Sequence, residues 1–362
     1  MHLADLPTPA LLLDAAKMRA NIARMNAAVS QHGVQLRPHL KTAKSTAIAR
    51  EMTAGWSGAV TVSTLKEAEE FAAAGYRDIL YAVGIAPGKL DQAAKLVARG
   101  VNLTLILDSV AAAEAVAAHA VRWPVLIEVD SDGRRAGVAP GNAEQLVAIG
   151  QALSAGAELH GVMTHRGGSY AAAGPDQLPE HAEAERRAAV TAAGTLRAAG
   201  FPCPVVSVGS TPTALFARNL TGVTEVRAGV YVFNDLVTAG LGVCGTEDVA
   251  ISVATSVIGH QPERGWVLID AGWMALSGDK GRGDQGYGMV AAEPDLIVVS
   301  ANQEHGILAR RDGGPIDHHR YPIGTQLRIL PNHACATAAQ HDRYHVLEED
   351  GLVQVWPRFG GW

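Results

Sequence analysis

Eight short, mostly apolar runs alternate with alanine-rich segments over the first two thirds of the chain, and this alternation restricts the fold more than any other feature. The runs cover residues 34–38, 59–64, 78–84, 102–108, 124–130, 158–165, 204–210 and 224–233. Segments between them, such as NAEQLVAIGQALSAG, repeat apolar residues at helical spacing. Apolar strands that alternate with helices are typical of a parallel sheet covered on both faces. Eight such units predict an α/β fold, a closed (β/α)8 barrel over residues 10–238.

The sequence changes character after Gly240. Segments such as AISVATSVIGH, GWVLIDAG and PDLIVVSAN have the pattern of strands joined by polar turns, with almost no helical periodicity. We therefore expect a second domain of antiparallel β structure, made of residues 239–362 together with residues 1–9.

Charge and composition exclude several classes of protein. The 362 residues include 30 Lys and Arg against 36 Asp and Glu, a net charge of −6 with no basic stripe, so nucleic acid is not an expected partner. No uncharged apolar run reaches the roughly 18 residues that would span a membrane, and Asp5 and Asp14 do not suit a signal peptide. Three scattered cysteines do not form a disulfide framework. These features predict a cytoplasmic protein.

The stretch VQLRPHLKTAKS places an amine, Lys41, just after the first predicted strand of the barrel. Catalytic groups of such barrels sit at the carboxyl ends of the strands. A single lysine there is usually a surface residue, but Arg37, His39 and Lys44 add positive charge that favours the free amine, the form that attacks an aldehyde. Because a cationic barrel mouth suits an anionic aldehyde, the sequence predicts pyridoxal phosphate bound to Lys41 as a Schiff base.

A phosphate site is then expected in the loops after strands seven and eight. The segment VSVGSTPT puts Ser210 and Thr211 at the start of a helix, where backbone N–H groups and hydroxyls would bind a dianion. The same pattern is also an ordinary helix cap. Asp130, Arg135 and His165 follow the fifth and sixth predicted strands at the same face of the barrel.

The eighth strand, in EVRAGVYVF, supplies a second part of this site. Gly229 would let the backbone approach the phosphate closely. Arg227 either faces into the barrel mouth or forms a structural ion pair with Glu225, and the sequence leaves both interpretations open.

The segment PNHACATAAQHDRYHV contains a possible metal site. His333 and Cys335 are two residues apart, so on an extended strand their side chains would project from the same face. An imidazole and a thiolate together suit zinc, with water and substrate at the remaining positions. A bare H-x-C pair is more often structural, and only the predicted pyridoxal site favours the metal. His341 and His345 are either further ligands or solvated, and Cys203 and Cys244 are expected to be structural.

Several motifs together resemble the D-serine dehydratase and D-threonine aldolase family, which shares the alanine-racemase-type fold (fold type III). They are RPHLKTAK, VSTLKEAEEFAAAGYRDILYAVGI, DSDGRRAGV, GVMTHRGGSY, EVRAGVYVFND, DAGWMALS, DQGYG and PNHACATA, in this order from about residue 5 to the C-terminus. The resemblance implies a pyridoxal-phosphate enzyme with a metal ion near the cofactor, a D-amino acid substrate and a homodimeric assembly. Residues Arg166 and Gly168 depart from the family's pattern.

The resemblance also implies roles for individual residues. Lys41 occupies the Schiff-base position, and Arg135 and Arg227 match arginines near the 3′-oxygen and the pyridine nitrogen of the cofactor. The remaining matches are Ser210, Thr211, Gly229 and Val230 for the phosphate, His333 and Cys335 for the metal, and Tyr170 near the cofactor. We include His165 among the cofactor-binding residues because of its place at the end of the sixth strand.

Two reactions fit these parts. A dehydratase would use Lys41 to remove the Cα proton, lose the β-hydroxyl and release a 2-oxo acid and ammonia, whereas an aldolase would release glycine and an aldehyde. In this family the cysteine beside the histidine resembles the zinc-type dehydratases, while the aldolases are expected to have aspartate there and to prefer manganese or magnesium. Dehydration of D-serine or a related D-3-hydroxy amino acid is therefore favoured over aldol cleavage. A racemase and a non-catalytic cofactor carrier are weaker alternatives.

Overall fold

Eight parallel strands form the barrel that the sequence predicts. The structure is a computed structural model that describes residues 5–55, 58–283, 285–348, 351 and 353–362. Its barrel strands are β2 (Gln35–Pro38), β3 (Val60–Val62), β4 (Asp78–Gly84), β5 (Asn102–Leu107), β6 (Pro124–Val129), β7 (Glu158–Thr164), β8 (Val205–Val208) and β9 (Glu225–Ala228). Each predicted run contains one of these strands, and they are ordered β2-β9-β8-β7-β6-β5-β4-β3. The predicted barrel is confirmed.

The barrel closes between its edge strands β2 and β3. His39 and Thr61 form a parallel bridge, and the N–H of Leu40 donates to the carbonyl of Thr61 at 2.9 Å. On its other side β2 pairs with β9 along its whole length, from Gln35 opposite Glu225 to Pro38 opposite Ala228. The turn that carries Lys41 therefore begins at the seam of the barrel.

Burial of both faces explains why the strand sequences lack a polar alternation. In β5 and β6 every residue after the first is buried. Neighbouring strands share a core cluster, to which β4, β5, β6 and β7 contribute Leu80, Ile106, Leu126 and Met163 respectively. The alternating pattern expected of a half-exposed sheet is absent from these strands because neither face meets water.

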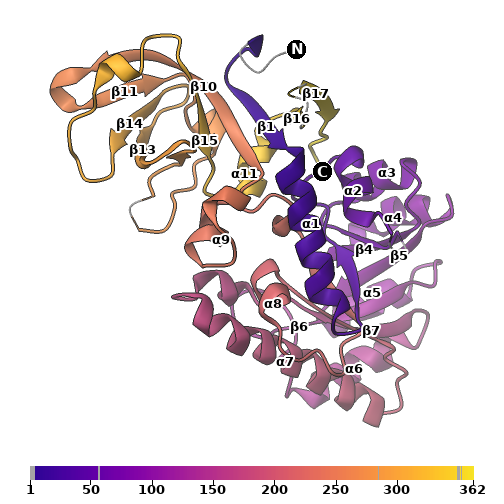
Figure 1. Cartoon of the computed structure of the whole chain (residues 1–362). Coiled ribbons are helices and arrows are strands. Elements are labelled where there is room, and N and C mark those ends of the chain that lie inside the picture. Colours follow the sequence, from indigo (N-terminus) through magenta and orange to yellow (C-terminus); the bar gives the residue numbers. More distant parts are fainter. Residues whose placement is uncertain (1–4, 56–57, 284, 349–350, 352) are drawn as a thin grey trace. The chain divides into compact units, whose positions relative to one another are not determined.

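Helices follow the barrel strands, as the coloured segments of Figure 1 show. They are α2 (Thr46–Thr53), α3 (Leu65–Ala73), α4 (Leu90–Val97), α5 (Val110–Ala117), α6 (Ala143–Leu153), α7 (Leu178–Ala198) and α8 (Thr211–Phe216), and α1 (Ala15–Ser30) precedes β2. Polar residues fix several starting points: Thr64, Ser109 and Asn142 accept the N–H of the residue three positions on, at α3, α5 and α6.

A nine-stranded sheet forms the second part of the described chain. Its strands are β1 (Ala10–Asp14), β10 (Ile251–Gln261), β11 (Trp266–Ile269), β12 (Met289–Val290), β13 (Glu293–Ala301), β14 (Gly306–Arg310), β15 (Gln326–Leu330), β16 (Arg343–Leu347) and β17 (Val353–Pro357). Its pairings are antiparallel, as predicted, except that β1 runs parallel to β16. Figure 1 shows β1, in indigo, beside β10, in orange.

The described chain divides into two compact units. One contains residues 1–23, 42–48 and 230–360, and the other contains residues 24–41, 49–229 and 361–362. The sequence predicts one domain over residues 10–238 and another over residues 239–362 with 1–9. A division by contacts does not show which parts fold independently, so these domain bounds stay a prediction. None of the described helices has the length and apolar character needed to cross a bilayer.

Candidate functional site

Lys41 lies in the turn after β2, with an exposed side chain. The backbone N–H of His39, two residues before Lys41, donates to the carbonyl of Ala228 on β9 at 2.8 Å. The backbone N–H of Lys41 faces Nδ1 of His39 at 3.4 Å, so Nδ1 acts as an acceptor and the imidazole is neutral. The sequence prediction that this lysine sits at the carboxyl end of a barrel strand is confirmed.

The positive charge predicted around Lys41 is smaller than the sequence indicated. Arg37 pairs with Glu225 at 2.8 Å and with Asp78 at 2.8 Å, so two carboxylates balance its charge. Burial lowers the pKa of His39 well below its ordinary value, and the charges of Lys41 and Arg227 lower it further. The expectation of positive charge beside the amine is wrong for His39, which burial keeps neutral, whereas Arg37 stays a cation whose charge is balanced by the two carboxylates.

His165 follows β7 and faces the end of β8. Its Nδ1–H donates to the carbonyl of Gly209 at 2.9 Å. Burial lowers the pKa of His165 to about 4, and the cations Lys41, Arg135 and Arg227 add to the decrease. The structure therefore brings these predicted site residues within electrostatic reach of one another and keeps the imidazole neutral.

The turn between β8 and α8 matches the predicted helix start. Ser210 caps α8, and its hydroxyl accepts the N–H of Thr213 at 3.2 Å while the Thr213 hydroxyl accepts the N–H of Ser210 at 3.0 Å. The Ser210 hydroxyl also contacts that of Ser169 at 3.0 Å. A helix start with two hydroxyl-bearing residues, Ser210 and Thr211, suits a phosphate.

Tyr170 joins this turn to His165. Its hydroxyl accepts the N–H of Thr211 at 3.4 Å, and its ring lies 6.4 Å from the ring of His165. Tyr170 belongs to the short 3-10 turn η3 (Gly167–Ala171). The side chains that the sequence placed near the cofactor ring and near the phosphate are therefore in contact.

Gly209 is required by the approach of β8 to β9. Its φ is +140°, and a Cβ there would lie 2.0 Å from the carbonyl oxygen of Arg227. Gly229 and Val230 follow β9 directly and are buried, and Val230 begins η5 (Val230–Val232). Their proposed contact with a phosphate stays a prediction.

Arg227 is buried and bound within the barrel. Its Nη1 donates to the hydroxyl of Ser207 at 2.8 Å, and its Nη2 donates to the carbonyl of Thr164 at 2.5 Å. Ser207 in turn donates to Glu225 at 2.6 Å. Arg227 thus reaches Glu225 through a serine, while Glu225 itself pairs with Arg37. Burial lowers the pKa of Arg227, and the charges of Glu225, Glu185 and Glu128 oppose this.

Arg135 lies in the loop after β6 and keeps most of its side chain in solvent. One of its nitrogens contacts Glu128 at 3.2 Å, with 60% of the side chain exposed. Asp130 shapes this loop, because its Oδ1 accepts the N–H of Asp132 at 3.0 Å and of Gly133 at 2.7 Å. Asp130 therefore has a structural contact in addition to its place at the strand end.

The residues of the barrel fit pyridoxal phosphate. An exposed amine follows β2, the cations Arg135 and Arg227 lie within electrostatic reach of His165, and a capped helix start lies beside Gly209. An amine can bond to the aldehyde, and helix N–H groups with hydroxyls can bind the phosphate.

The metal pair lies at the start of a helix, so the predicted strand through it is wrong. β15 ends at Leu330, and α11 (Ala334–Ala339) begins after His333, which is its N-cap residue with an extended backbone. Cys335 lies close enough to His333 to be the main cause that raises the pKa of the imidazole to about 9, while burial acts in the opposite direction. The expected nearness of imidazole and thiol is therefore supported by electrostatics, with a helix start in place of a strand.

Neighbouring side chains fix both members of this pair. Asp279 lies 2.7 Å from Nδ1 of His333, and the hydroxyl of Thr42 lies 3.2 Å from the sulfur of Cys335. The buried carboxylate of Asp235 accepts the N–H of Ala334, between them, at 3.0 Å. Since Nδ1 faces a carboxylate, Nε2 of His333 is left to bind a metal, an arrangement common at metal sites.

The donor set fits a metal ion held by two protein ligands. Within the described ranges, no group of three or more His, Cys, Asp and Glu side chains is arranged to hold a metal. His341 instead contacts the carbonyl of Ala275 through Nε2 at 3.0 Å, and His345 lies on β16. An imidazole and a thiolate would leave open positions for water and substrate, as at a catalytic zinc.

Residues 42–44, directly after Lys41, form hydrogen bonds with residues of the unit that contains Cys335. Besides the contact of Thr42, the Tyr344 hydroxyl donates to the carbonyl of Ala43 at 2.6 Å, and the N–H of Phe359 donates to the carbonyl of Lys44 at 2.9 Å. Lys44 has a φ of +45° in this turn.

Sequence reasoning missed several of these partners. Thr213 could have been found, since S-x-x-T is close to a capping-box pattern, and so could Asp235 in DLVT. Thr42, Asp279 and Glu185 are far in sequence from the residues they contact, and no local pattern indicates them. Asp284, the first residue of DQGYG, lies outside the described residues.

Known proteins resemble the chain over its whole length. A family model described as the alanine racemase N-terminal domain matches residues 13–236, and one described as a putative serine dehydratase domain matches residues 250–347. The chain is 54% identical to the D-threo-3-hydroxyaspartate dehydratase of Delftia sp. strain HT23, over 99% of both chains. It covers 100% of the solved structure of that protein with a TM-score of 0.97.

Two other relatives are named for related reactions. The chain is 31% identical to the D-serine dehydratase of Dictyostelium discoideum, with 96% of this chain and 95% of that protein covered. It is 27% identical to a solved D-threonine aldolase from Filomicrobium marinum, with a TM-score of 0.82 over 98% and 96% of the two chains.

Two further solved structures bear on the H-x-C pair. They are variants of a D-threo-3-hydroxyaspartate dehydratase in which a histidine and a cysteine, two positions apart, are each replaced by alanine. The cysteine variant is in the metal-free form. His333 and Cys335 have the same spacing in this chain.

Proposed function

Because the chain belongs to the family of pyridoxal-phosphate-dependent D-amino-acid dehydratases and aldolases with an alanine-racemase-type N-terminal domain, we propose that it dehydrates a D-3-hydroxy amino acid with a second carboxylate, D-threo-3-hydroxyaspartate. The products are oxaloacetate and ammonia. The observation that carries the proposal is the pair His333 and Cys335, held at the start of α11 by Asp279 and Thr42. D-Serine is the expected weaker substrate.

The choice of dehydration rests on the thiol in this pair. A thiolate ligand favours zinc over harder cations. Zinc in this position would polarise the hydroxyl group of the substrate and so lower the barrier to its loss. We propose zinc as the metal, with manganese and magnesium as the alternatives. The dehydratases from Delftia and Dictyostelium support the reaction by their names, and the aldolase resemblance, at 27% identity, supports the alternative less.

The choice of a dicarboxylate rests on charge in the barrel. The charges of Lys41, Arg135 and Arg227 all lower the pKa of His165, so the three cations lie around this residue. The Arg135 side chain is 60% exposed. A substrate with two carboxylates would be attracted to this cluster more strongly than D-serine. The 54% identity to a hydroxyaspartate dehydratase supports the same choice.

The side chains have distinct tasks in this proposal. When bound, the cofactor ring stabilises the charge that builds at Cα and the metal polarises the β-hydroxyl. The amine of Lys41 holds the aldehyde before substrate arrives and then takes the Cα proton. Neutral His165, oriented by Gly209, would pack beside the cofactor without adding charge. His333 and Cys335 hold the metal.

The proposed assembly is a cytoplasmic homodimer. Cys203, Cys244 and Cys335 are not joined by disulfide bonds, and a thiol that binds metal must stay reduced, which suits the cytoplasm. The dimer rests on resemblance to the family, and light scattering of the purified protein tests it.

The test of function is a product analysis. Protein loaded with pyridoxal phosphate and zinc, and separately with manganese, is given D-threo-3-hydroxyaspartate, D-serine and D-threonine, and 2-oxo acid, ammonia, glycine and aldehyde are quantified together. We expect oxaloacetate and ammonia in equal amounts with zinc, and none from Lys41→Ala. Glycine with glyoxylate or acetaldehyde, and best activity with manganese, would instead make the protein an aldolase.

A further inference from the structure

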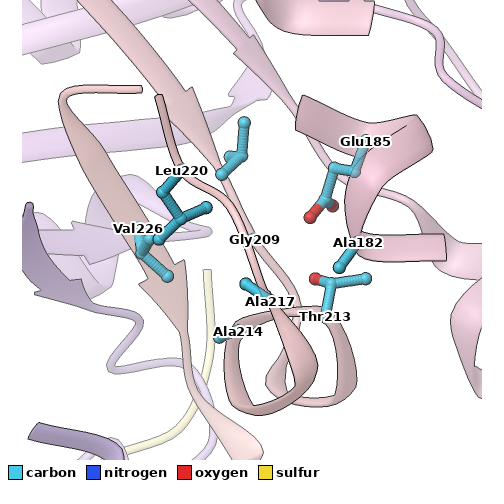
Figure 2. A pocket seen from close by; sticks show the side chains of 9 residues that line it. Ala182, Glu185, Gly209, Thr213, Ala214, Ala217, Leu220 and Val226 are labelled. Atoms are coloured by element: carbon cyan, nitrogen blue, oxygen red, sulfur yellow. The ribbon is translucent and has the colours of Figure 1, made fainter. Parts of the chain in front are cut away.

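Glu185 on α7 is a carboxyl group that the proposed reaction does not use. Its side chain is only 1% exposed and lines a small cavity of about 10 Å³, with room for roughly one water molecule. Figure 2 shows the carboxyl pointing from α7 towards Thr213, with the apolar side chains of Leu220 and Val226 across the cavity. A buried carboxyl needs partners, and those of Glu185 identify its task.

The partners of Glu185 belong to the ends of two adjacent barrel strands. One carboxyl oxygen accepts the N–H of Arg166, the residue after His165, at 2.8 Å. Thr213 and Gly209 line the same cavity as Glu185, and both act to lower the pKa of its carboxyl group. Glu185 is therefore bonded to the loop after β7 and lies beside both sides of the turn between β8 and α8.

The same turn holds the residues proposed to bind the cofactor phosphate. Thr213 closes the capping box with Ser210, so a shift of Thr213 moves the Ser210 backbone and hydroxyl. Gly209 accepts the Nδ1–H of His165 through its carbonyl. Thr211 follows Ser210, and its N–H donates to the hydroxyl of Tyr170. Glu185 therefore lies beside the turn proposed to bind the phosphate, close to Gly209 before α8 and to Thr213, the third residue of α8.

Electrostatics agree with this position. Burial raises the pKa of Glu185, while its hydrogen bonds to Thr213 and Arg166 and the charge of Arg227 oppose the increase. Each of these opposing contributions stabilises the carboxylate, so the residues around Glu185 compensate in part for its burial.

We propose that Glu185 is a positioning residue for the cofactor phosphate, which it serves by fixing the Ser210–Thr213 turn against the loop after β7. This rests on the proposed phosphate role of Ser210 and Thr211. It does not depend on which D-amino acid reacts, and cofactor affinity can be measured without turnover.

The test compares pyridoxal phosphate with pyridoxal, which has the same aldehyde ring and no phosphate. Cofactor-free wild type, Glu185→Gln and Glu185→Ala are titrated with each compound, and binding is followed by the absorbance of the bound ring. We expect Glu185→Ala to weaken the binding of pyridoxal phosphate about tenfold, which is the order of one lost hydrogen-bond network. The binding of pyridoxal should be nearly unchanged. Glutamine keeps one acceptor and one donor, so Glu185→Gln should stay within about threefold of wild type.

Glu183→Gln is the matched control, because Glu183 lies on the same helix but is bonded to Arg186 on the surface. Thermal unfolding is measured for every variant, and Glu185→Asp, one methylene shorter, replaces Glu185→Ala if alanine does not fold. Equal weakening of both compounds, or no change in either, would overturn the proposal. A wild type that does not prefer the phosphorylated compound would overturn it as well, whereas a failure of the dehydration assay alone would leave it standing.

Discussion

The hydroxyl of Thr42 lies 3.2 Å from the sulfur of Cys335, and Thr42 is the residue that follows Lys41 in the chain. The residue beside the proposed cofactor lysine is thus also the partner of a proposed metal ligand. A hydroxyl that donates to a thiolate stabilises its negative charge and fixes its direction.

Replacing Thr42 by valine should weaken metal binding, because valine keeps the shape of threonine but cannot donate to the sulfur. We expect the affinity for Co²⁺ to fall about tenfold, in the range found for lost partners of metal ligands. Titration of metal-free protein with Co²⁺, followed by the cobalt–thiolate absorption, measures it. Thr42→Ser keeps the hydroxyl and should bind normally; equal affinity of the valine variant would show that the contact is irrelevant to the metal.

Replacing Asp279 by asparagine tests the other ligand. Asp279 lies 2.7 Å from Nδ1 of His333 and so directs Nε2 to the metal. Loss of the charge should lower metal affinity about tenfold while leaving the fold intact, since both side chains are half exposed. Metal content after dialysis against a weak chelator gives the measurement. Asp312→Asn, at an exposed carboxylate paired with Arg310, is the control, and a similar loss of metal there would contradict the assignment.

Acid should destabilise the protein partly through His165. Its pKa is about 4 in the folded chain, against 6.5 when unfolded, so between these values the unfolded chain binds a proton that the folded chain does not. The unfolding free energy therefore falls as pH decreases from 6.5 towards 4, by about 2 kcal/mol from this residue at pH 5. Urea unfolding at pH 7 and pH 5 measures the loss.

The matched variant for this prediction is His165→Asn, whose amide can still donate to Gly209 but does not titrate. Its unfolding free energy should decrease less between the two pH values than that of the wild type. An identical decrease in both proteins would mean that His165 does not contribute to the acid sensitivity.

Removing the charge of Glu225 should destabilise the barrel. Glu225 pairs with Arg37 at 2.8 Å and accepts from Ser207 at 2.6 Å, and its side chain is 10% exposed. Glu225→Gln leaves the half-buried Arg37 and the buried Arg227 with one carboxylate fewer, which should cost about 2–4 kcal/mol of unfolding free energy. Urea unfolding tests this, and a change below about 0.5 kcal/mol, typical of a surface residue, would contradict it.

The barrel could be predicted from sequence because its signals are local. Each strand is a continuous apolar run, and each is followed by a helix whose cap or periodicity is visible within a few residues. Lys41, His165 and Ser210 could be placed at one face for the same reason, since parallel strands all end there.

What the sequence could not predict depends on contacts between distant segments. The pairing of β2 with β9 brings Glu225 to Arg37 and so cancels a charge that looked free in RPHLK. The apolar residues around His333 suit a strand or a short helix equally, and the N-cap conformation of His333 decides it. Asp279 and His333 are 54 residues apart, and only the folded chain brings them together.

The membership of β1 in the sheet of the C-terminal strands has a consequence for synthesis on the ribosome. Ala10 pairs with Ala254 and Leu12 with His345, so β1 has no sheet partner until β10 has been translated, and its second partner, β16, follows later still. Its apolar residues, Leu11, Leu12 and Leu13, must remain exposed or be shielded by a chaperone while the barrel strands are being translated. A release of the chain after the barrel would leave β1 without either of its sheet partners and its apolar residues open to aggregation.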